Sequence, residues 1–474
     1  MGSTNDGRIS NGCHVVAMPY PGRGHVNPMM NLCKLLVSKL GENIKISFVV
    51  TEEWFGFIDS NPRPPQIQLR TIPNVIPSER VRALDFAGFV DSVFTKVEAP
   101  VEELMEKLEF ESPVTAIIAD TYLALAVNVG NRRNIPVVSL WTMSPSVFSV
   151  LYHFDLFAQN GHFPVDLSER GDEIIDYIPG ITPTRLSDMP TIFEGTGREV
   201  LGRAMEAFEL VRNKAQCVLF TSFHELEAQL VETLMAILPM PIYSIGPSIP
   251  HLPTALDQEN CQIPDSNSSK QEYYLKWLDV QPRSSVLYVS LGSFLSVSKE
   301  QMEEILAGLH DTGVRYLLIS RGDISQVDGT LADEEMKSAR SLVVPWCDQL
   351  RVLSHSSVGG FWTHCGWNST LEGVYSGVPM LTFPIFFDQV PNKKLIVDDW
   401  KVGMKVTGAE KLVQRDEIAK IVKKFMDLGE GNEECKDMRR RSNELKESCR
   451  KALAEGGSSD INLDAFIKTI LVLA

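Results

Sequence analysis

Short apolar runs alternate with longer amphipathic segments along the first half of the chain. Apolar runs of this length, bounded by polar or turn-forming residues, predict buried strands. They occupy residues 14–18, 44–50, 114–119, 136–140, 215–221 and 241–245. A helix is predicted over residues 29–40, between the first two runs. Strands that alternate with helices are typical of βαβ units, so this half predicts a doubly wound parallel sheet.

A second alternating set follows a change in composition. Residues 248–270 are rich in Pro, Ser, Asn and Asp and keep no periodicity, which predicts a linker. Beyond the linker, the pattern predicts strands at residues 286–290, 316–320, 342–344, 357–363 and 378–383. Helices are predicted at residues 299–310, 430–451 and 461–473. The chain is therefore expected to contain two similar α/β halves.

Length, composition and charge narrow the possible classes of protein. The chain has 474 residues, of which 44% are hydrophobic, enough for two or more domains. Its net charge of −16 disfavours nucleic acid and anionic membranes as partners. The eight cysteines include no CxxC pair, so they are expected to be reduced and structural. No apolar run reaches the ~18 residues that span a bilayer, which with the polar N-terminus favours a cytoplasmic protein.

Many of the polar residues best suited to binding a ligand gather between Trp346 and Gln389. This block contains a single Lys or Arg, Arg351, so a bound anion would rely on neutral donors and backbone N–H groups. The pattern predicts a strand that ends at Thr363 and a helix that opens near Asn368. The helix N-terminus offers free N–H groups and a positive dipole end, which suit a phosphate or diphosphate.

Three polar residues of this block are spaced four apart. His364, Asn368 and Glu372 are therefore predicted to share one face of the helix. The first two can donate hydrogen bonds to phosphate, and the carboxylate can accept them from ribose hydroxyls. An ordinary αβ unit with a capped helix is the alternative for each residue alone, but the whole set in this order favours a nucleotide site.

His25 follows the first predicted strand, at the position where open α/β sheets place their ligands. The positive end of the following helix disfavours imidazolium, so a neutral imidazole would be available as a base near pH 7. Asp120 ends another apolar run and would hold the second ring nitrogen. A helix cap or core position is the alternative for His25, and a helix N-cap is the alternative for Asp120.

The loop before His25 weakly resembles a dinucleotide-binding loop. It has Gly22 and Gly24, but Asn27 stands where the third glycine of that motif is expected. The acidic pair Glu52 and Glu53 lies 30 residues beyond Gly22, where about 20 is expected. Binding of a nicotinamide or flavin cofactor is therefore disfavoured.

Several motifs together resemble those of plant family 1 glycosyltransferases, which use UDP-sugars. They are the block from Trp346 to Gln389, the sequence Pro-Tyr-Pro-Gly-Arg-Gly-His-Val-Asn-Pro at residues 19–28, and shorter motifs at residues 119–120, 141–142 and 290–293. The resemblance covers nearly the whole chain, and the Pro-Tyr-Pro-Gly-Arg-Gly-His loop is similar to that of the UGT87A-like subgroup. It implies a GT-B fold, in which two doubly wound Rossmann-like domains face a cleft.

The resemblance also implies an organisation and a reaction. An N-terminal acceptor-binding domain is expected at residues 1–247, a linker at 248–270 and a C-terminal UDP-sugar-binding domain at 271–457. The helix at 458–474 is expected to pack back on the first domain. The reaction would invert the configuration of the sugar on transfer to a small lipophilic acceptor, in a monomer that needs no metal or other cofactor.

Functional roles carry over by position. His25 and Asp120 would form the catalytic pair, in which His25 removes the acceptor proton. UDP-glucose would be bound by Thr142, Ser293, Trp346, Cys347, Gln349, His364, Gly366, Trp367, Asn368, Ser369, Glu372, Asp388 and Gln389. The acceptor cleft would include Phe89, Tyr122, Met143, Phe148 and Phe193.

Individual contacts are implied for part of this set. Trp346 would stack on uracil, Gln349 would hold ribose together with Glu372, and Thr142 would contact the 6-hydroxyl of the sugar. Glutamine at position 389 is the type associated with glucose, whereas relatives that prefer galactose more often have histidine.

The chain departs from many relatives at one point of the first loop. Gly22 and Arg23 replace an Ala-Gln pair, and Arg23 would add a charge at the mouth of the cleft. The second hypothesis for the whole protein is a non-catalytic sensor of a UDP-sugar or small lipophile. A sensor is disfavoured because it needs no base, whereas this chain keeps the full set His25, Asp120, His364, Glu372 and Gln389.

Overall fold

The chain divides into two compact units in the computed structural model. Unit 1 consists of Met1–Ser248 and Lys451–Ala474, and unit 2 consists of Ile249–Arg450. The described residues are 12–190, 197–249, 273–292, 297–320, 339–406, 412–429 and 431–471. Apart from its first two residues, the predicted linker at 248–270 lies outside this described part.

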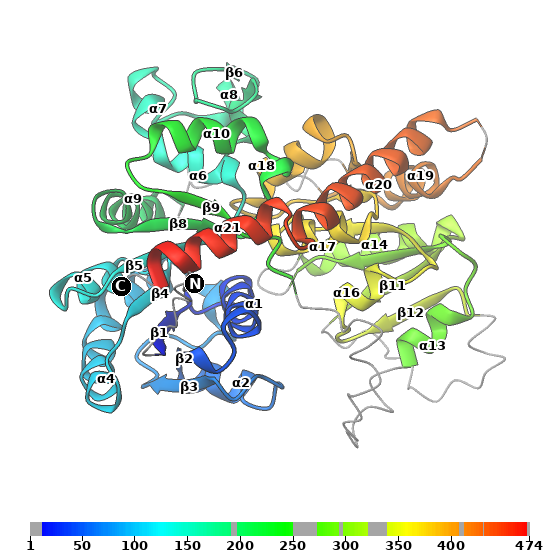
Figure 1. The fold of residues 1–474 in the computed structure, drawn as a ribbon. Coiled ribbons are helices and arrows are strands. Elements are labelled where there is room, and N and C mark those ends of the chain that lie inside the picture. The colour runs from blue at the N-terminus through cyan, green and yellow to red at the C-terminus, as the bar shows by residue number, and fades with distance from the viewer. Residues whose placement is uncertain are drawn as a thin grey trace, which may run out of the picture. The chain divides into compact units, whose positions relative to one another are not determined.

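Unit 1 is built on a seven-stranded sheet, visible in Figure 1, in which neighbouring strands pair in parallel. The strand order β3-β2-β1-β4-β5-β8-β9 reverses its direction of winding between β1 and β4. This reversal makes the carboxyl ends of β1 and β4 the topological switch point, where such sheets bind ligands. The strands are β1 (Cys13–Met18), β2 (Ile44–Thr51), β3 (Ile67–Ile72), β4 (Ala116–Asp120), β5 (Val137–Trp141), β8 (Cys217–Phe220) and β9 (Ile242–Ser244).

Helices cover this sheet, and α1 (Arg23–Leu40) shows why. Its residues Val26, Met29 and Leu36 are spaced to face one side, and they join the strand residues in one apolar core. The other helices are α2 (Glu52–Ile58), α3 (Phe86–Lys96), α4 (Glu98–Glu111), α5 (Ala124–Arg132), α6 (Pro145–Tyr152), α7 (Asp155–Gln159), α8 (Leu167–Arg170), α9 (Gly197–Lys214) and α10 (Ala228–Ile237). A small antiparallel hairpin joins β6 (Ile174–Ile175) to β7 (Thr184–Arg185).

The C-terminal segment completes unit 1. Its helix α21 (Ser458–Phe466) lies beside β9, as Figure 1 shows, and Phe466 is buried in the same core as β1. The hydroxyl of Ser459 donates a hydrogen bond to the carbonyl of Gly246, just beyond β9. The last turns, residues Ile467–Leu471, continue as a π-helix.

Unit 2 contains a six-stranded parallel sheet in the order β12-β11-β10-β13-β14-β15. Its winding reverses between β10 and β13, so the switch point lies at their carboxyl ends. The strands are β10 (Val286–Ser290), β11 (Arg315–Ile319), β12 (Ser341–Val344), β13 (Val358–Thr363), β14 (Met380–Thr382) and β15 (Gly403–Lys405). The helices are α13 (Tyr273–Asp279), α14 (Lys299–Thr312), α16 (Gln349–Leu353), α17 (Trp367–Ser376), α18 (Gln389–Lys394), α19 (Arg415–Met426) and α20 (Glu433–Leu453).

The predicted α/β class with two Rossmann-like sheets is confirmed. Each predicted strand is present within one or two residues at its ends. Strands β3 and β15 were not predicted, because β3 mixes exposed polar with apolar residues and β15 has three residues. Helix α1 begins six residues before the predicted start at Met29. Gly24 and Pro28 disguise this first part, although a proline near a helix N-terminus removes few backbone hydrogen bonds.

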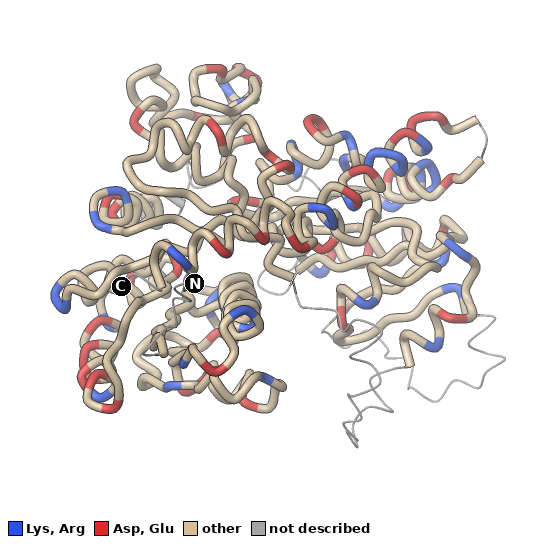
Figure 2. The backbone as a smooth tube through the Cα atoms, viewed as in Figure 1, with Lys and Arg blue, Asp and Glu red and all other residues tan. Residues whose placement is uncertain are grey.

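Charges on α20 are largely paired within the helix. Figure 2 shows Lys and Arg interspersed with Asp and Glu along it, and Arg440 pairs with both Asp437 and Glu444. Arg439 is different, because its guanidinium donates a hydrogen bond to the carbonyl of Phe425. None of the helices in the described part of the chain has the length and apolar character needed to cross a membrane.

Candidate active site

The switch point of unit 1 brings His25 and Asp120 together. His25 lies in the first turn of α1, Asp120 is the last residue of β4, and the Nδ1 atom of His25 is 2.7 Å from Oδ2 of Asp120. The other carboxylate oxygen accepts a hydrogen bond from the backbone N–H of Tyr122 at 3.0 Å. Asp120 is only 3% exposed, so these two partners hold it in one orientation.

The alternative roles considered for this pair do not fit. The N-cap of α1 is Gly22, whose carbonyl accepts from the backbone N–H of His25 at 2.9 Å, so the imidazole does not cap the helix. Helix α5 begins at Ala124 after the N-cap residue Leu123, so Asp120 does not cap it. The side chains of His25 and Asp120 instead bind each other.

Thr142 adds a second oxygen to the same ring nitrogen. It follows β5, is buried, and places Oγ1 2.9 Å from Nδ1 of His25. An ionised carboxylate can only accept, so the contact with Asp120 places the imidazole hydrogen on Nδ1. The threonine oxygen then shares that hydrogen, and Nε2 keeps the lone pair that a base requires. The sequence resemblance implied a sugar contact for Thr142 and gave no sign of this one.

Aromatic rings surround the imidazole of His25. The ring of Tyr20 lies 5.2 Å from it and that of Tyr122 6.5 Å, measured between centroids. Tyr20 also meets Phe89 edge to face at 6.2 Å. Burial raises the pKa of Tyr20 well above its usual value, so its hydroxyl stays protonated. Tyr20 was not among the predicted site residues, although it lies within the Pro-Tyr-Pro-Gly-Arg-Gly-His motif.

The predicted acceptor residues separate into two groups. Tyr122 lies beside the imidazole of His25, whereas Phe89 contacts Tyr20 behind it and is only 1% exposed. Phe148 is 1% exposed and packs against Trp141, Phe208 and Phe220, so it fills the core of unit 1. Met143 follows Thr142 and is buried, whereas Phe193 lies outside the described residues.

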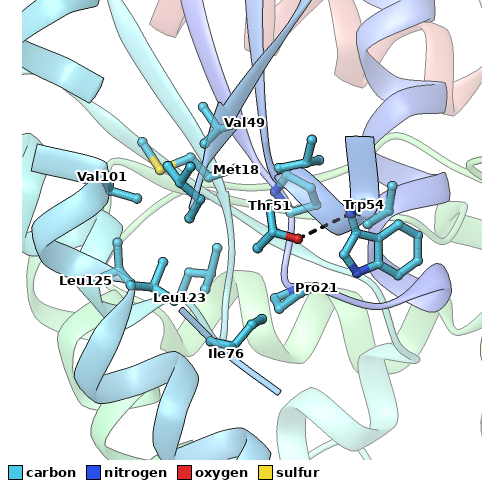
Figure 3. Close-up of a pocket in the computed structure, with 14 residues that line it drawn as sticks. Met18, Pro21, Val49, Thr51, Trp54, Ile76, Val101, Leu123 and Leu125 are labelled. Carbon is cyan, nitrogen blue, oxygen red and sulfur yellow. Dashed lines mark hydrogen bonds between the residues drawn. The ribbon is translucent and has the colours of Figure 1, made fainter. Parts of the chain in front are cut away.

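A small apolar cavity lies near the carboxyl ends of β1 and β2 (Figure 3). Its free volume is about 30 Å³, room for one or two water molecules and too little for a lipophilic acceptor. Thr51 and Trp54 line it, and the Thr51 hydroxyl oxygen caps α2 by accepting from the Trp54 N–H, drawn as the dashed line. None of the four predicted acceptor residues that the structure describes lines this cavity.

In unit 2, the switch point places His364 directly after β13. Helix α17 begins at Trp367 with Gly366 as its N-cap, so the backbone N–H groups of its first turn face this point. His364 therefore precedes the helix, and the predicted stripe of His364, Asn368 and Glu372 on one helix face is wrong. A turn at His364–Gly366 separates strand from helix, and only the last two residues of the stripe share a face.

Two glycines enclose the ring of His364. A Cβ atom at Gly366 would lie 2.4 Å from Nε2, and one at Gly292 would lie 2.9 Å from the same atom. Gly292 also has a φ of 92°, which a side chain would strain. Burial lowers the pKa of His364 to about 4, so the imidazole is neutral near pH 7. It can donate one hydrogen bond to a phosphate but adds no positive charge.

Gln349 connects the residues predicted to hold ribose. Its Nε2 atom donates to Oε2 of Glu372 at 2.6 Å and to Oγ of Ser369 at 2.9 Å. Its carbonyl oxygen accepts from the hydroxyl of Tyr288 at 3.1 Å. Burial raises the pKa of Glu372 to about 7, although the bond from Gln349 opposes this shift. Tyr288 and Ser369 thereby fix the amide that positions the carboxylate.

Trp346 and Cys347 differ sharply in exposure. Trp346 is 52% exposed, unlike the buried tryptophans of the core, so about half of its surface is accessible to a ligand. Cys347 is buried with its Sγ 3.4 Å from the hydroxyl of Tyr288. Its backbone is therefore held in place next to the exposed ring.

The residues predicted to contact the sugar are partly engaged with the protein. Trp367 is buried against Trp400, which leaves its backbone for a ligand. Gln389 accepts the backbone N–H groups of Ile385 and Phe386 at 2.8 and 3.0 Å through Oε1, so its Nε2 is the end suited to a sugar. Oδ2 of Asp388 accepts from Asn392 at 2.9 Å, and Ser293 lies outside the described residues.

Potential metal ligands are dispersed where the structure can be described. Within those ranges, no three His, Cys, Asp or Glu side chains are grouped to hold a metal ion. The cysteines described there are free and buried.

Comparison with known proteins shows to which family the chain belongs. Residues 99–428 match the family model described as UDP-glucoronosyl and UDP-glucosyl transferase. The chain belongs to this family. Its relatives include UDP-glycosyltransferases 87A2 and 87A1 of Arabidopsis thaliana. The first is 50% identical over 460 residues, 96% of each chain. The second is 51% identical over 458 residues, 96% of this chain and 99% of the relative.

The fold of this chain is also similar to that of a solved structure. UGT2 of Phytolacca americana, complexed with UDP-2fluoro-glucose and pterostilbene, matches with a TM-score of 0.78 at 26% identity. The match covers 96% of this chain and 99% of that one. The predicted family and its UGT87A-like subgroup are thus confirmed, and the chain is a glycosyltransferase with the GT-B fold. These relatives give no support to the sensor hypothesis.

Proposed function

We propose that the enzyme transfers glucose from UDP-glucose to a hydroxyl or carboxyl group of a small lipophilic acceptor, with inversion. The observation that carries this proposal is the 2.7 Å contact between Nδ1 of His25 and Oδ2 of Asp120. A buried carboxylate bound to one ring nitrogen leaves the other nitrogen as a base, and stabilises the imidazolium that forms.

The chemical step begins at His25. Its Nε2 takes the proton of an acceptor hydroxyl while the acceptor oxygen forms a bond to the anomeric carbon. The bond between that carbon and the β-phosphate oxygen of UDP breaks, and UDP leaves with its electron pair. Attack from the face opposite UDP turns an α-linked donor into a β-glucoside. An acceptor carboxylate is already ionised and is only oriented by the imidazole.

UDP is assigned to the switch point of unit 2. The N-terminal N–H groups of α17, with the side chains of His364, Asn368 and Ser369, would bind the diphosphate. Because His364 is neutral, the helix dipole carries most of the favourable electrostatic interaction. Trp346 would stack on uracil, and Glu372 would accept hydrogen bonds from ribose.

The sugar and acceptor are proposed from chemistry at the two sites. The amide Nε2 of Gln389, with Asp388, would bind the glucose hydroxyls. The aromatic surroundings of His25 suit a phenolic, terpenoid or hormone-like acceptor. The Phytolacca americana structure contains a fluorinated UDP-glucose and pterostilbene, which agrees with both proposals.

The test is UDP release from UDP-glucose and from UDP-galactose with a panel of phenols, terpenols and aromatic acids. We expect turnover with UDP-glucose, a product with the β configuration by NMR, and activity that survives a chelator. UDP binding without turnover on any acceptor would contradict transferase activity on these classes. Equal use of UDP-galactose would remove only the preference for glucose.

A further inference from the structure

Arg82 is a buried arginine beside the loop that precedes His25. It begins a short 3₁₀ turn and is only 8% exposed. One guanidinium nitrogen, Nη1, donates to the carbonyl of Pro21 at 2.8 Å and lies 3.0 Å from Oε2 of Glu79. The guanidinium also lies over the ring of Phe89, with its carbon 5.4 Å from the ring centroid. A buried cation is costly unless it is paired, so these contacts fix its position.

The carbonyl of Pro21 belongs to the peptide group that leads directly into α1. The next residue, Gly22, caps the helix, and its carbonyl accepts from the backbone N–H groups of His25 and Val26 at 2.9 and 2.8 Å. A peptide plane is rigid, so the hydrogen bond from Arg82 restrains the residue on which the first helical turn is built. The orientation of His25 therefore depends on a side chain that does not contact it.

Gly22 is explained by the closeness of Arg82. Its φ of 169° is extended backbone that any residue adopts, so conformation alone does not require glycine. A Cβ atom there would lie 2.5 Å from Nη1 of Arg82, closer than any real contact. The guanidinium would have to shift, which would disturb the contacts of Nη1 with Pro21 and Glu79. The glycine that distinguishes this loop from the Ala-Gln loops of many relatives is thus the space that the guanidinium needs.

Arg82 is in turn held from α2. In the first turn of that helix, Glu53 accepts the hydroxyl of Ser78 through one oxygen and the backbone N–H of Glu79 through the other, the latter at 2.9 Å. Glu79 then pairs with Arg82. Glu53 therefore secures the segment that carries the arginine.

We propose that Arg82 is a positioning residue for His25, and that Gly22 and Arg82 act as a matched pair. The effect on turnover rests on the proposed role of His25 as the base. The structural part of the proposal, that Arg82 sets the orientation of the His25 ring, can be measured without any acceptor.

The experiment compares G22A, R82M and the double variant with the wild type. A small displacement of a base lowers turnover strongly, so each single variant is expected to lower kcat about tenfold or more with a phenol that is un-ionised at assay pH. An ionised nitrophenol does not need the base and should lose much less. Affinity for UDP should stay within twofold. R82M removes Nη1, the atom with which the methyl group added by G22A collides. In the R82M background, G22A should therefore lower kcat little further.

A matched control is R133M. Arg133 is another largely buried arginine of unit 1, paired with Glu102 and Glu109, and it is not bonded to the loop before His25. R133M removes a comparable ion pair and should leave the ratio of activities on the two phenols unchanged. If R82M proves too unstable to purify, G22A alone tests the proposal, since it displaces the arginine without removing it.

NMR spectra of protein with ¹⁵N-labelled histidine report on the His25 ring without requiring turnover. The ring signals of His25 should shift in G22A and R82M, whereas those of the exposed His310 stay in place. Unchanged His25 signals in the folded variants, additive losses in the double variant, or equal losses on both phenols would overturn the proposal. Absence of wild-type turnover with every acceptor would instead count against the proposed function, and the spectra would still decide the positioning of His25.

Discussion

Nδ1 of His25 and Oδ2 of Asp120 lie 2.7 Å apart, although the two residues are 95 positions apart in the sequence. The pairing arises because β1 and β4 are neighbours at the switch point of the first sheet, in register from Val15 with Ala116 to Met18 with Ala119. The contact fixes the tautomer of the imidazole, with the hydrogen on Nδ1 and the lone pair on Nε2.

Asp120→Asn is expected to lower kcat by about 100-fold or more, because an amide does not stabilise imidazolium and can present N–H to the wrong ring nitrogen. The loss should be largest for un-ionised alcohols and phenols. UDP affinity, measured by calorimetry, should match the wild type because UDP is assigned to unit 2. A kcat within a few-fold of the wild type would show that the carboxylate does not support the base.

Thr142→Val and Thr142→Ser separate the two roles assigned to this threonine. Valine keeps the shape but removes the oxygen that lies 2.9 Å from Nδ1 of His25, so we expect about a tenfold loss on un-ionised acceptors. Serine restores the oxygen and should recover most of that activity. A loss confined to the KM for UDP-glucose, equal for all acceptors, would indicate that Thr142 contacts only the sugar.

The carboxyl of Glu372 is predicted to make UDP binding depend on pH. Its pKa is raised to about 7, and the ionised form accepts hydrogen bonds from ribose more strongly than the neutral carboxyl does. UDP affinity should therefore rise as pH increases towards and through 7, because a larger fraction of the carboxyl is ionised. Glu372→Gln should weaken binding and remove this dependence. Calorimetric titrations between pH 5.5 and 8 measure this dependence. If UDP affinity varies with pH in Glu372→Gln as it does in the wild type, the assignment of Glu372 to ribose is contradicted.

The raised pKa of Glu372 also predicts that stability changes with pH. A carboxyl with a folded-state pKa above its usual 4.5 favours folding most at low pH, and this contribution falls as pH rises from about 4.5 to about 7. The shift corresponds to at most about 3 kcal/mol at neutral pH. Glu372→Gln should remove that penalty, so its free energy of unfolding relative to the wild type should increase over this interval. Denaturant titrations at several pH values measure the difference.

Gln389 is predicted to serve both its loop and the sugar, through different atoms. Gln389→Glu keeps an oxygen for the backbone N–H groups of Ile385 and Phe386 but loses the amide donors. It should raise the KM for UDP-glucose while UDP affinity stays near the wild type. Gln389→Ala should also loosen the loop and lower turnover with every donor. If the two variants show the same KM for UDP-glucose and the same turnover, the side chain of Gln389 acts on the loop alone.

Sequence patterns predicted most of the fold because both sheets are buried on two faces. Their strands are continuous apolar runs, and the polar residue at the end of each run marks a carboxyl edge. His25 and Asp120 could therefore be assigned to one edge before any contact was known. Strand β3 was not predicted, because an edge strand with exposed positions lacks that pattern.

Contacts set by turns and by distant side chains could not be predicted in this way. The four-residue spacing of His364, Asn368 and Glu372 suggested one helix face, but a turn with Cys365 at a φ of 65° intervenes. The bond between Thr142 and His25 depends on the register of β4 and β5. Arg82 lies in a segment without periodicity, and only the absence of a side chain at Gly22 hinted that something approaches the loop there.

His25→Ala, measured with an un-ionised phenol and with UDP alone, tests directly whether His25 is the base. We predict that kcat falls by at least about 100-fold while the dissociation constant for UDP stays within twofold, because we assign the base to unit 1 and the nucleotide to unit 2. Turnover of the phenol at a rate close to that of the wild type would contradict the assignment of His25 as the base, and with it the mechanism proposed for this glycosyltransferase.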